Sequence, residues 1–317
     1  MGLWLHLFSI TSTRSSVKDN QEIVLPQRDK LLVNNLKWQW DIRFPSRPIF
    51  QEKTALQYIA YHNQHRAQHL IGRGQPMQSP YWIEHHKQND DFCRSHEAIF
   101  AQQKIGKMLG KNYIWDVLTN RSPAEQYHSL LLPECPVLNQ HLASSYTEDL
   151  LLLSQLYPEL SFAFNSWKAG ASQNHFHCHV LFSYIQILQN PLQYKETRHR
   201  VNISLVKDYP IVCIACIADN TKDLIICIQK YIQALIVSEI PYNTVFFRGM
   251  FYVVPRSKEC DDNGVSRGVD TVFGKIPMTS ERSFKSFNQK EAEHILRTVG
   301  VQTWTFAKTT YSATDKK

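Results

Sequence analysis

The chain has 317 residues, of which 43% are hydrophobic and 12% aromatic. This composition can fill a buried core and excludes a disordered protein, and the length suits one large domain or two ordinary ones. The formal net charge is +7, but the basic residues are spread along the chain and form no basic arm or stripe. The charge is therefore as compatible with small anionic substrates as with nucleic acid.

The seven cysteines are odd in number and have no repeated spacing. This argues against a disulfide framework and predicts a reducing compartment, for which we take the cytoplasm. The apolar run at residues 4–10 is too short to span a bilayer. We expect residues 1–20 to be a frayed end and not a transit peptide.

Residues 1–120 are interpreted as a front layer of the catalytic domain that completes a substrate site. Within them, residues 54–70 have a helical pattern, and residues 73–79 form a loop that carries Gly and Pro.

A first set of elements follows. A strand is predicted at residues 127–132, before Pro133. Thr147 is predicted to cap a helix with acidic residues in its first turn and a body at residues 150–156. Two further strands are predicted at residues 161–167 and 174–182.

A second set has the same order. It comprises a strand at residues 211–217, a helix at 221–237 with one apolar face, and strands at 242–247 and 250–254. The last two strands are joined by a tight turn at Arg248 and Gly249, because Gly supplies a positive φ.

The order strand, helix, strand, strand therefore occurs twice, which predicts two related halves at residues 121–200 and 201–317. A final helix is predicted at residues 288–299, followed by a polar, mobile tail to residue 317.

The most informative stretch lies at residues 170–182. In a strand, side chains alternate between the two faces, so His175, His177 and His179 are expected on one face and apolar residues on the other. Imidazole is a good nucleophile near neutral pH because its neutral nitrogen is available without a strong base. Attack on an α-phosphorus would split one hard displacement into two easier ones.

The residues before these histidines suit a phosphate. Gly170 and Ala171 form a small-residue turn whose backbone amides can approach phosphoryl oxygens, and Ser172 and Gln173 add a hydroxyl and an amide. Two other interpretations of the three histidines are a zinc site and a passive polar face.

The stretch resembles the histidine-triad superfamily, in the branch of the diadenosine tetraphosphate phosphorylases and galactose-1-phosphate uridylyltransferases. Members carry a small-residue turn with Ser and Gln, and then His-x-His-x-Gln with the middle His as the nucleophile. In this chain, residues 170–173 and the pair His175 and His177 match that motif.

Further similarity covers about residues 125–275. Residues 127–133 resemble the family's early strand, in which His128 would lie near the catalytic histidines, and Asn165 resembles a substrate-contacting Asn. Residues 241–243 and 253–257 resemble a Pro-Tyr-Asn and a Val-Pro-Arg-Ser segment of the phosphorylases' second half.

The resemblance implies an α+β fold of the histidine-triad type, with an antiparallel sheet, helices and two related half-barrel repeats in one chain. It implies a nucleotidyltransferase or phosphorylase that forms a covalent nucleotidyl-His177 at the α-phosphate of a dinucleoside polyphosphate or nucleotide sugar. The expected site residues fall into two groups. The catalytic ones are His177, His175, His179 and His128, and the substrate-binding ones are Asn165, Gly170, Ala171, Ser172, Gln173, Lys168 and Arg256.

One position departs from the branch. His179 stands where the branch has Gln, as in the small histidine-triad hydrolases. The acceptor therefore stays open between phosphate, a sugar phosphate and water. A non-catalytic nucleotide-binding module is a rival interpretation, against which the intact histidines count. A nucleic-acid deadenylase is another, but it has no zinc-finger spacing or basic-aromatic cluster in its favour.

No cofactor is required for this chemistry, and neither the oligomeric state nor the nucleobase follows from the sequence. Some uridylyltransferase relatives bind metal, so Cys93, His96, Cys135 and His175 are an alternative structural zinc site. We do not adopt it, because one short Cys-x-x-His is a weak signal and free buried cysteines are common. The expected partner is a nucleotide, with no membrane.

Overall fold

The computed structural model describes residues 32–38, 51–55, 57–62, 104–120, 123–134, 139–171, 175–182 and 185–303. Within these residues, ten strands form one antiparallel sheet. In spatial order the strands are β3 (Lys104–Leu109), β4 (Ile114–Thr119), β5 (Ser129–Pro133), β7 (Cys178–Leu181), β6 (Ser161–Asn165), β11 (Tyr242–Phe247), β12 (Met250–Pro255), β10 (Ile214–Ile217), β9 (Val201–Val206) and β8 (Leu192–Arg198).

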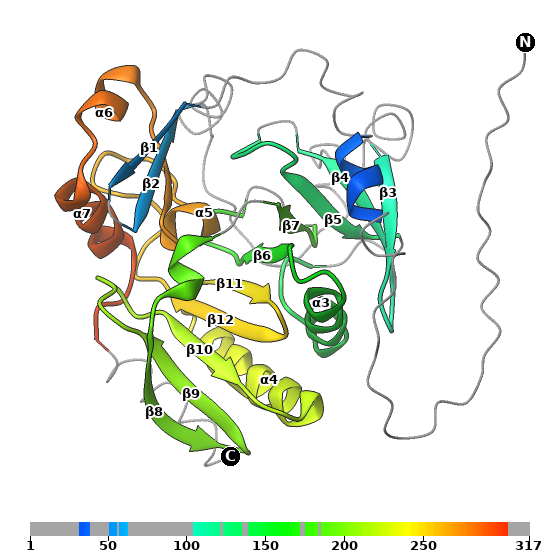
Figure 1. Ribbon diagram of the computed structural model, residues 1–317. Coiled ribbons are helices and arrows are strands. Elements are labelled where there is room, and N and C mark those ends of the chain that lie inside the picture. Colours follow the sequence, from blue (N-terminus) through cyan, green and yellow to red (C-terminus); the bar gives the residue numbers. More distant parts are fainter. Residues whose placement is uncertain are drawn as a thin grey trace, which may run out of the picture.

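The sheet is built from two halves with the same strand order, which join at its centre (Figure 1). In the first half β5 is followed by helix α3 (Ser144–Leu156) and then by β6 and β7, and in the second half β10 is followed by helix α4 (Thr221–Val237) and then by β11 and β12. The two central strands β6 and β11 pair antiparallel, with Asn165 opposite Asn243. The predicted α+β fold with two related halves is therefore confirmed. Strands β3 and β4, which lie within residues 1–120, form the outer edge of the first half.

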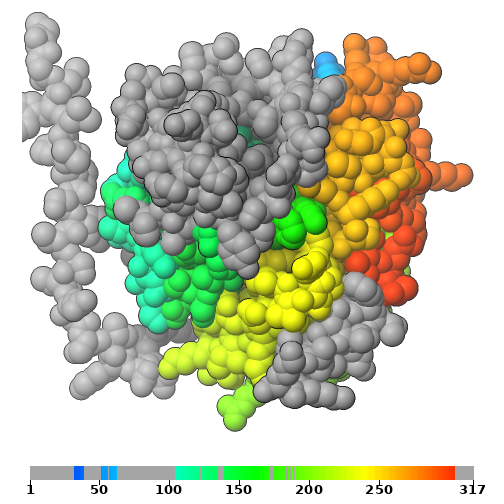
Figure 2. All heavy atoms as spheres, turned by 180° about the vertical axis from the view of Figure 1, so that it is seen from behind, coloured from blue at the N-terminus to red at the C-terminus, as the bar shows by residue number. Residues whose placement is uncertain are grey.

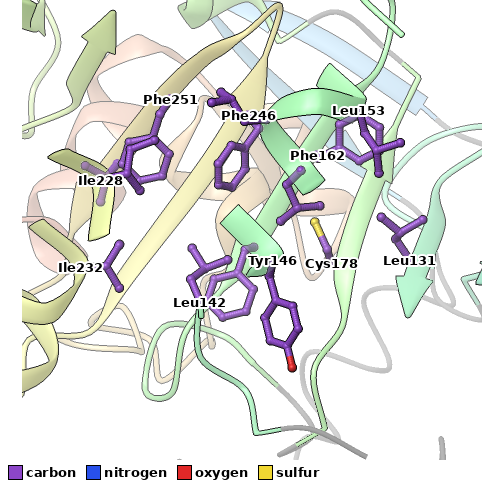
Figure 3. Close-up of a cluster of buried hydrophobic side chains, with 14 of the residues drawn as sticks. Leu131, Leu142, Tyr146, Leu153, Phe162, Cys178, Ile228, Ile232, Phe246 and Phe251 are labelled. Atoms are coloured by element: carbon purple, nitrogen blue, oxygen red, sulfur yellow. The ribbon is translucent and has the colours of Figure 1, made fainter. Parts of the chain in front are cut away.

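Helices α3 and α4 pack against each other and cover one face of the sheet. Their apolar side chains pack against those of the central strands and form a single core that both halves share. Figure 3 shows this core, in which side chains of α3 and α4 meet side chains of β6, β7, β11 and β12. The inward residues Phe162 and Phe246, which are opposite each other in the register, are fully buried.

A second core lies on the other face of the sheet. It is covered by β1 (Gln51–Ala55), β2 (Tyr58–His62), η3 (Gln186–Gln189), α5 (Val269–Val272), β13 (Lys275–Pro277), α6 (Glu281–Ser286) and α7 (Gln289–Val299). Strands β1, β2 and β13 form a separate small sheet among the described residues. From behind, α6 and α7 lie together at one side of the molecule, coloured orange to red (Figure 2). The core beneath these elements includes residues of the second half of the sheet together with Ala163 of β6 and Leu181 of β7.

Three predictions of local structure are wrong. The part of residues 54–70 that the structure describes is not helical but belongs to β1 and β2, because Tyr58 and Ala60 alternate into the second core. Helix α3 begins at Ser144, so Thr147 is not its cap but lies inside it and donates its hydroxyl to the carbonyl of Ala143. The histidine strand is also shorter than predicted, since β7 spans only Cys178–Leu181.

In the second half, the observed helices and the tight turn agree closely with those predicted from the sequence. Helix α4 has the predicted bounds, and its N-cap Asn220 accepts a hydrogen bond from the amide of Lys222. Arg248 and Gly249 both have positive φ, as the predicted tight turn requires. Helix α7 is capped by Asn288.

The tail beyond residue 303 and the loop at residues 73–79 lie outside the described residues. No helix in the described ranges is long and apolar enough to cross a membrane.

Candidate active site at the histidine cluster

The backbone of His177 is held by one buried side chain. The Gln140 Oε1 atom accepts from the backbone amide of His177 at 3.0 Å. The Gln140 Nε2 atom donates to the carbonyls of His177 and Asn165, at 3.2 Å and 2.9 Å. Gln140 is 1% exposed, so these bonds form away from water. They fix the irregular segment before β7 to the end of β6.

The ring of His177 is oriented by its neighbour. The Nδ1 atom of His177 lies 2.8 Å from the carbonyl oxygen of His175. A carbonyl can only accept, so Nδ1 carries the proton, and the neutral ring then has an unprotonated Nε2. This is the form in which an imidazole attacks an electrophile. His175 therefore orients the His177 ring through its backbone carbonyl.

Two further histidines form a buried pair beside His177. The Nε2 atom of His128 lies 2.9 Å from Nδ1 of His179, and the rings of His177 and His179 have centroids 5.7 Å apart. The Nε2 atom of His179 lies 3.0 Å from Nδ2 of Asn165. The structure thus brings together His128, His177, His179 and Asn165, which were expected at the site. All four are at least nine-tenths buried.

The second half of the sheet supports this cluster through Asn243. The Nδ2 atom of Asn243 donates to Oδ1 of Asn165 at 2.7 Å and to the carbonyl of Ala169 at 2.8 Å. The backbone amide of Val269 donates to the same Asn165 oxygen at 2.8 Å. Asn165 is therefore held from three directions, by β7, β11 and α5.

Arg256 does not have the expected role of a phosphate partner. It is 2% exposed, and its five N–H groups all donate to protein acceptors. These acceptors are Oδ1 of Asn243 and the carbonyls of Val299, Arg267, Lys258 and Glu259. Burial lowers the pKa of the guanidinium to about 10, so the group is still a cation at neutral pH. The sequence could not distinguish this internal role from phosphate binding, because both use an Arg at the end of a strand.

The expected phosphate turn is only partly described. Gly170 has φ 94°, and a Cβ atom on it would lie 2.7 Å from the Cα of Gly268, so only glycine fits this approach of two loops. Ala171 is buried next to it. Ser172 and Gln173 lie outside the described residues.

Lys168 is exposed and lies with its ammonium group 4.1 Å from the centroid of the Trp167 ring. This is a cation–π contact at the surface of the turn. The phosphate contact expected for Lys168 therefore stays a prediction.

The sequence did not predict a buried ion pair between Glu125 and Lys275. Glu125 is 3% exposed, and its carboxylate accepts from the amide of Phe182 and pairs with the ammonium of Lys275 at 3.0 Å. Burial opposes the charge of Lys275, but Glu125 and Glu52 outweigh it and raise the pKa of Lys275. Glu125 and Lys275 line a cavity of about 20 Å³, which has room for roughly one water molecule. Neither Glu125 nor Gln140 stands in a recognisable motif.

The described residues contain no group of three or more His, Cys, Asp and Glu side chains that could hold a metal ion. Cys93, His96 and Cys135 of the alternative zinc site lie outside them. The zinc alternative therefore stays a prediction from the sequence. Cys178, which is next to His177 in sequence, faces the core, where burial raises the pKa of its thiol.

Comparisons with known proteins agree with this fold. Residues 187–316 match the family described as GDPGP1-like, C-terminal domain. Yeast Ap4A phosphorylase Apa2 in complex with Ap4A matches with a TM-score of 0.59 and 13% sequence identity, over 84% of this chain and 97% of that chain. The same enzyme in complex with AMP matches with a TM-score of 0.58 and 13% identity, over 84% and 96%.

No curated protein matches the chain in sequence. At 13% identity, the likeness to the yeast structures concerns the fold. The resemblance inferred from the histidine motif is nevertheless confirmed by two independent comparisons, one of the C-terminal segment and one of the fold. The chain has the fold of the yeast Ap4A phosphorylase structures, and its residues 187–316 match the GDPGP1-like C-terminal domain family.

Proposed function

We propose that the protein is a nucleotidyltransferase or phosphorylase that acts at the α-phosphate of a dinucleoside polyphosphate or nucleotide sugar. The reaction passes through a covalent nucleotidyl-His177. The observation that carries this proposal is the His177 ring, whose Nδ1–H donates to the His175 carbonyl at 2.8 Å while Gln140 holds the backbone. A ring held in this tautomer presents a nucleophilic Nε2 without having to reorganise.

In the first step, the Nε2 lone pair of His177 forms a bond to the α-phosphorus, and the phosphorus–oxygen bond to the leaving group breaks. The leaving group departs with the bonding electrons as a phosphorylated anion. The positive charge of the phosphorylated ring is shared with Nδ1–H, which keeps its bond to the His175 carbonyl. In the second step an oxygen of the acceptor attacks the same phosphorus, and the nitrogen–phosphorus bond breaks.

The remaining site residues bind and orient. The amides of Gly170 and Ala171, with Ser172 and Gln173, hold phosphoryl oxygens in this proposal, and Asn165 fixes the buried histidine pair. Lys168 is placed at the surface of the same turn, where a cation would attract a polyphosphate. Inorganic phosphate as the acceptor makes the enzyme a phosphorylase, and water makes it a hydrolase. The likeness to a yeast phosphorylase supports phosphate, and His179 in place of Gln supports water.

The test is intact-protein mass spectrometry after brief incubation with diadenosine tetraphosphate, ATP and a panel of nucleotide sugars. We expect a nucleotide-sized mass increase on the unsubstituted protein and none on His177→Ala. The matched control is His294→Ala, which removes an exposed histidine and should leave the adduct intact. Turnover of any donor that persists in His177→Ala would contradict the covalent mechanism. Nucleotide binding without any turnover would support the non-catalytic binding module instead.

A further inference from the structure

The turn at residues 123–128, which precedes β5, bonds to the ring of His128 through its own backbone. The amide of Ala124 donates to Nδ1 of His128 at 2.8 Å, and the amide of His128 donates to the carbonyl of Glu125 at 3.3 Å. A backbone N–H can only donate, so Nδ1 accepts and the proton of the neutral ring lies on Nε2. The side-chain amide of Asn120, 3.1 Å from Nε2, can present either its oxygen or its NH₂ group there, so the tautomer depends on the backbone donor.

This turn contains a strained residue. Tyr127, directly before His128, has φ 67°, a left-handed conformation that bulky residues rarely adopt. Such a conformation persists only where the surrounding contacts hold it. Two contacts act on Tyr127 itself, since its ring lies 5.8 Å from that of Phe182 and its carbonyl accepts from the hydroxyl of Ser129 at 2.8 Å. The position of the Ala124 amide depends on how the rest of the turn is anchored.

The Glu125 carboxylate anchors the turn to two distant segments. One oxygen accepts from the backbone amide of Phe182, directly after β7, at 2.8 Å, and the other accepts from the ammonium of Lys275 in β13 at 3.0 Å. Lys275 also pairs with Glu52 of β1 at 3.1 Å. Burial lowers the pKa of Lys275, but the two carboxylates outweigh it and raise the pKa, so the ammonium stays charged. The side chains of Glu125 and Lys275 are 4% and 13% exposed, and water therefore screens their attraction little.

We propose that Glu125 and Lys275 are positioning residues for His128. Their ion pair fixes the strained turn to the small sheet, so that the Ala124 amide stays against Nδ1 and the ring keeps its proton on Nε2. Lys275 belongs to the second half of the chain and acts on a histidine of the first half without touching it. That the orientation of His128 serves nucleotidyl transfer rests on the proposed function.

The tautomer of His128 sets the direction of its contact with His179. With Nε2 protonated, His128 donates to Nδ1 of His179 over 2.9 Å. The ring of His179 lies beside that of His177, with the two centroids 5.7 Å apart. A turn that lost its anchor would leave the direction of this bond unfixed next to the proposed nucleophile.

The first test is the tautomer of His128, read by ¹⁵N NMR of the histidine rings in the full-length protein, with His128→Gln used to assign the signal. We expect one tautomer in the parent, protonated on Nε2. Lys275→Met removes the cation, and Glu125→Gln removes the charge but keeps an oxygen for the Phe182 amide. Both variants should show signals of both tautomers. A parental ring protonated on Nδ1, or one unchanged tautomer in both variants, would overturn the proposal.

The second test separates positioning from stability. Lys275→Met leaves a buried carboxylate without its cation and should destabilise the fold, whereas Glu125→Gln/Lys275→Met removes both charges and should recover stability in urea denaturation. We expect the double variant to keep both tautomers and to form the adduct on His177 about tenfold or more slowly than the parent, since a misplacement of about 1 Å can cost about 100-fold in rate. Parental tautomer and rate in a folded double variant would show that the pair is merely structural.

The matched control is Glu281→Gln/Lys285→Met, which removes the same two charges from an exposed ion pair of α6. It should change neither the tautomer nor the rate. Adduct formation is measured with the donor that labels His177 in the parent. If none of the donors labels it while the tautomers behave as expected, the proposed function is wrong and the positioning of His128 stands.

Discussion

At the scale of residues, the candidate site is built from side chains that bond to several backbone groups at once. Gln140 alone bonds three backbone groups, two of them on His177. Such a residue converts an irregular segment into a fixed one, because a buried backbone group left without a partner costs about 1–3 kcal/mol. His177 thus lies before β7 but has the fixed orientation of a strand residue.

His141, next to Gln140, gives the site region a pH dependence of stability. Burial lowers the pKa of His141, so the folded protein favours the neutral ring. Stability from this group is complete above the unfolded-state pKa of about 6.5 and is lost as pH falls from there through the lower folded-state pKa.

We therefore expect the free energy of unfolding of the parent to fall, relative to that of His141→Gln, between about pH 6.5 and the lower folded-state pKa. Urea denaturation of both proteins from pH 5 to 8 measures this difference. The other histidines cancel in the comparison because both proteins contain them. A difference that does not change with pH would contradict the assignment to His141.

The sequence predicted four residues that the structure brings together, namely His128, His177, His179 and Asn165. The histidine motif predicted His177 and His179, and the resemblance of two neighbouring strands to the family predicted His128 and Asn165. Neither predicted Gln140 or the network through Asn243 and Arg256, since those partners are 25 to 78 residues away from Asn165 or act through another residue. A pattern of residue types carries no information about which buried donors meet which acceptors.

At the scale of elements, helix α3 contains an acidic residue, Asp149, whose predicted role was wrong. Asp149 was expected in the first turn, where the helix dipole favours an acid, but α3 begins earlier and its first turn has no acid. The Asp149 carboxylate is fully buried and accepts from the backbone amides of Lys111, Asn112 and Tyr113 and from the indole of Trp115. It fixes the turn between β3 and β4 to the helix.

Asp149→Ala should lower the free energy of unfolding by about 3 kcal/mol or more, because it leaves several buried N–H groups without an acceptor. The neighbouring Glu148→Ala is the control. Glu148 pairs with Lys111 at the surface, and exposed pairs of this kind contribute about 1 kcal/mol or less. Urea denaturation followed by circular dichroism compares the two. Equal losses would show that the carboxylate does not hold the turn.

Elements with a cap residue or a clear apolar periodicity in the sequence were predicted well, and elements that depend on distant strand pairing were not. Helix α4 has an N-cap residue and a continuous apolar face, and both are local properties of the sequence. By contrast, the last two residues of β1 and all of β2 were predicted as part of a helix. Their strand character comes from pairing with each other and with β13, which is more than 200 residues away. Tertiary pairing overrides local propensity in such segments.

At the scale of the whole molecule, the repeat order predicted two related halves but not how they join. Strands β6 and β11 pair directly, α3 packs on α4, and one core contains residues of both halves. The polar network from Arg256 to His179 crosses the same boundary. Such pairings are far apart in the chain, so sequence periodicity does not predict them. The halves therefore form one structural unit, and the second half holds side chains of the candidate site in the first.

This organisation predicts one cooperative unfolding unit. Phe246 belongs to the second half, is fully buried, and lies opposite Phe162 of the first half in the register of the central strands. Phe246→Ala should reduce the free energy of unfolding by about 3–5 kcal/mol, as for large-to-small changes in a packed core. Because the core is shared, amide hydrogens of β7 should lose protection from exchange as much as those of β12. Tyr194→Ala, on the edge strand β8 where the side chain is 59% exposed, is the control and should change stability by only about 0.5 kcal/mol. Hydrogen exchange followed by mass spectrometry would contradict a single unit if Phe246→Ala exposed β12 while β7 kept its parental protection.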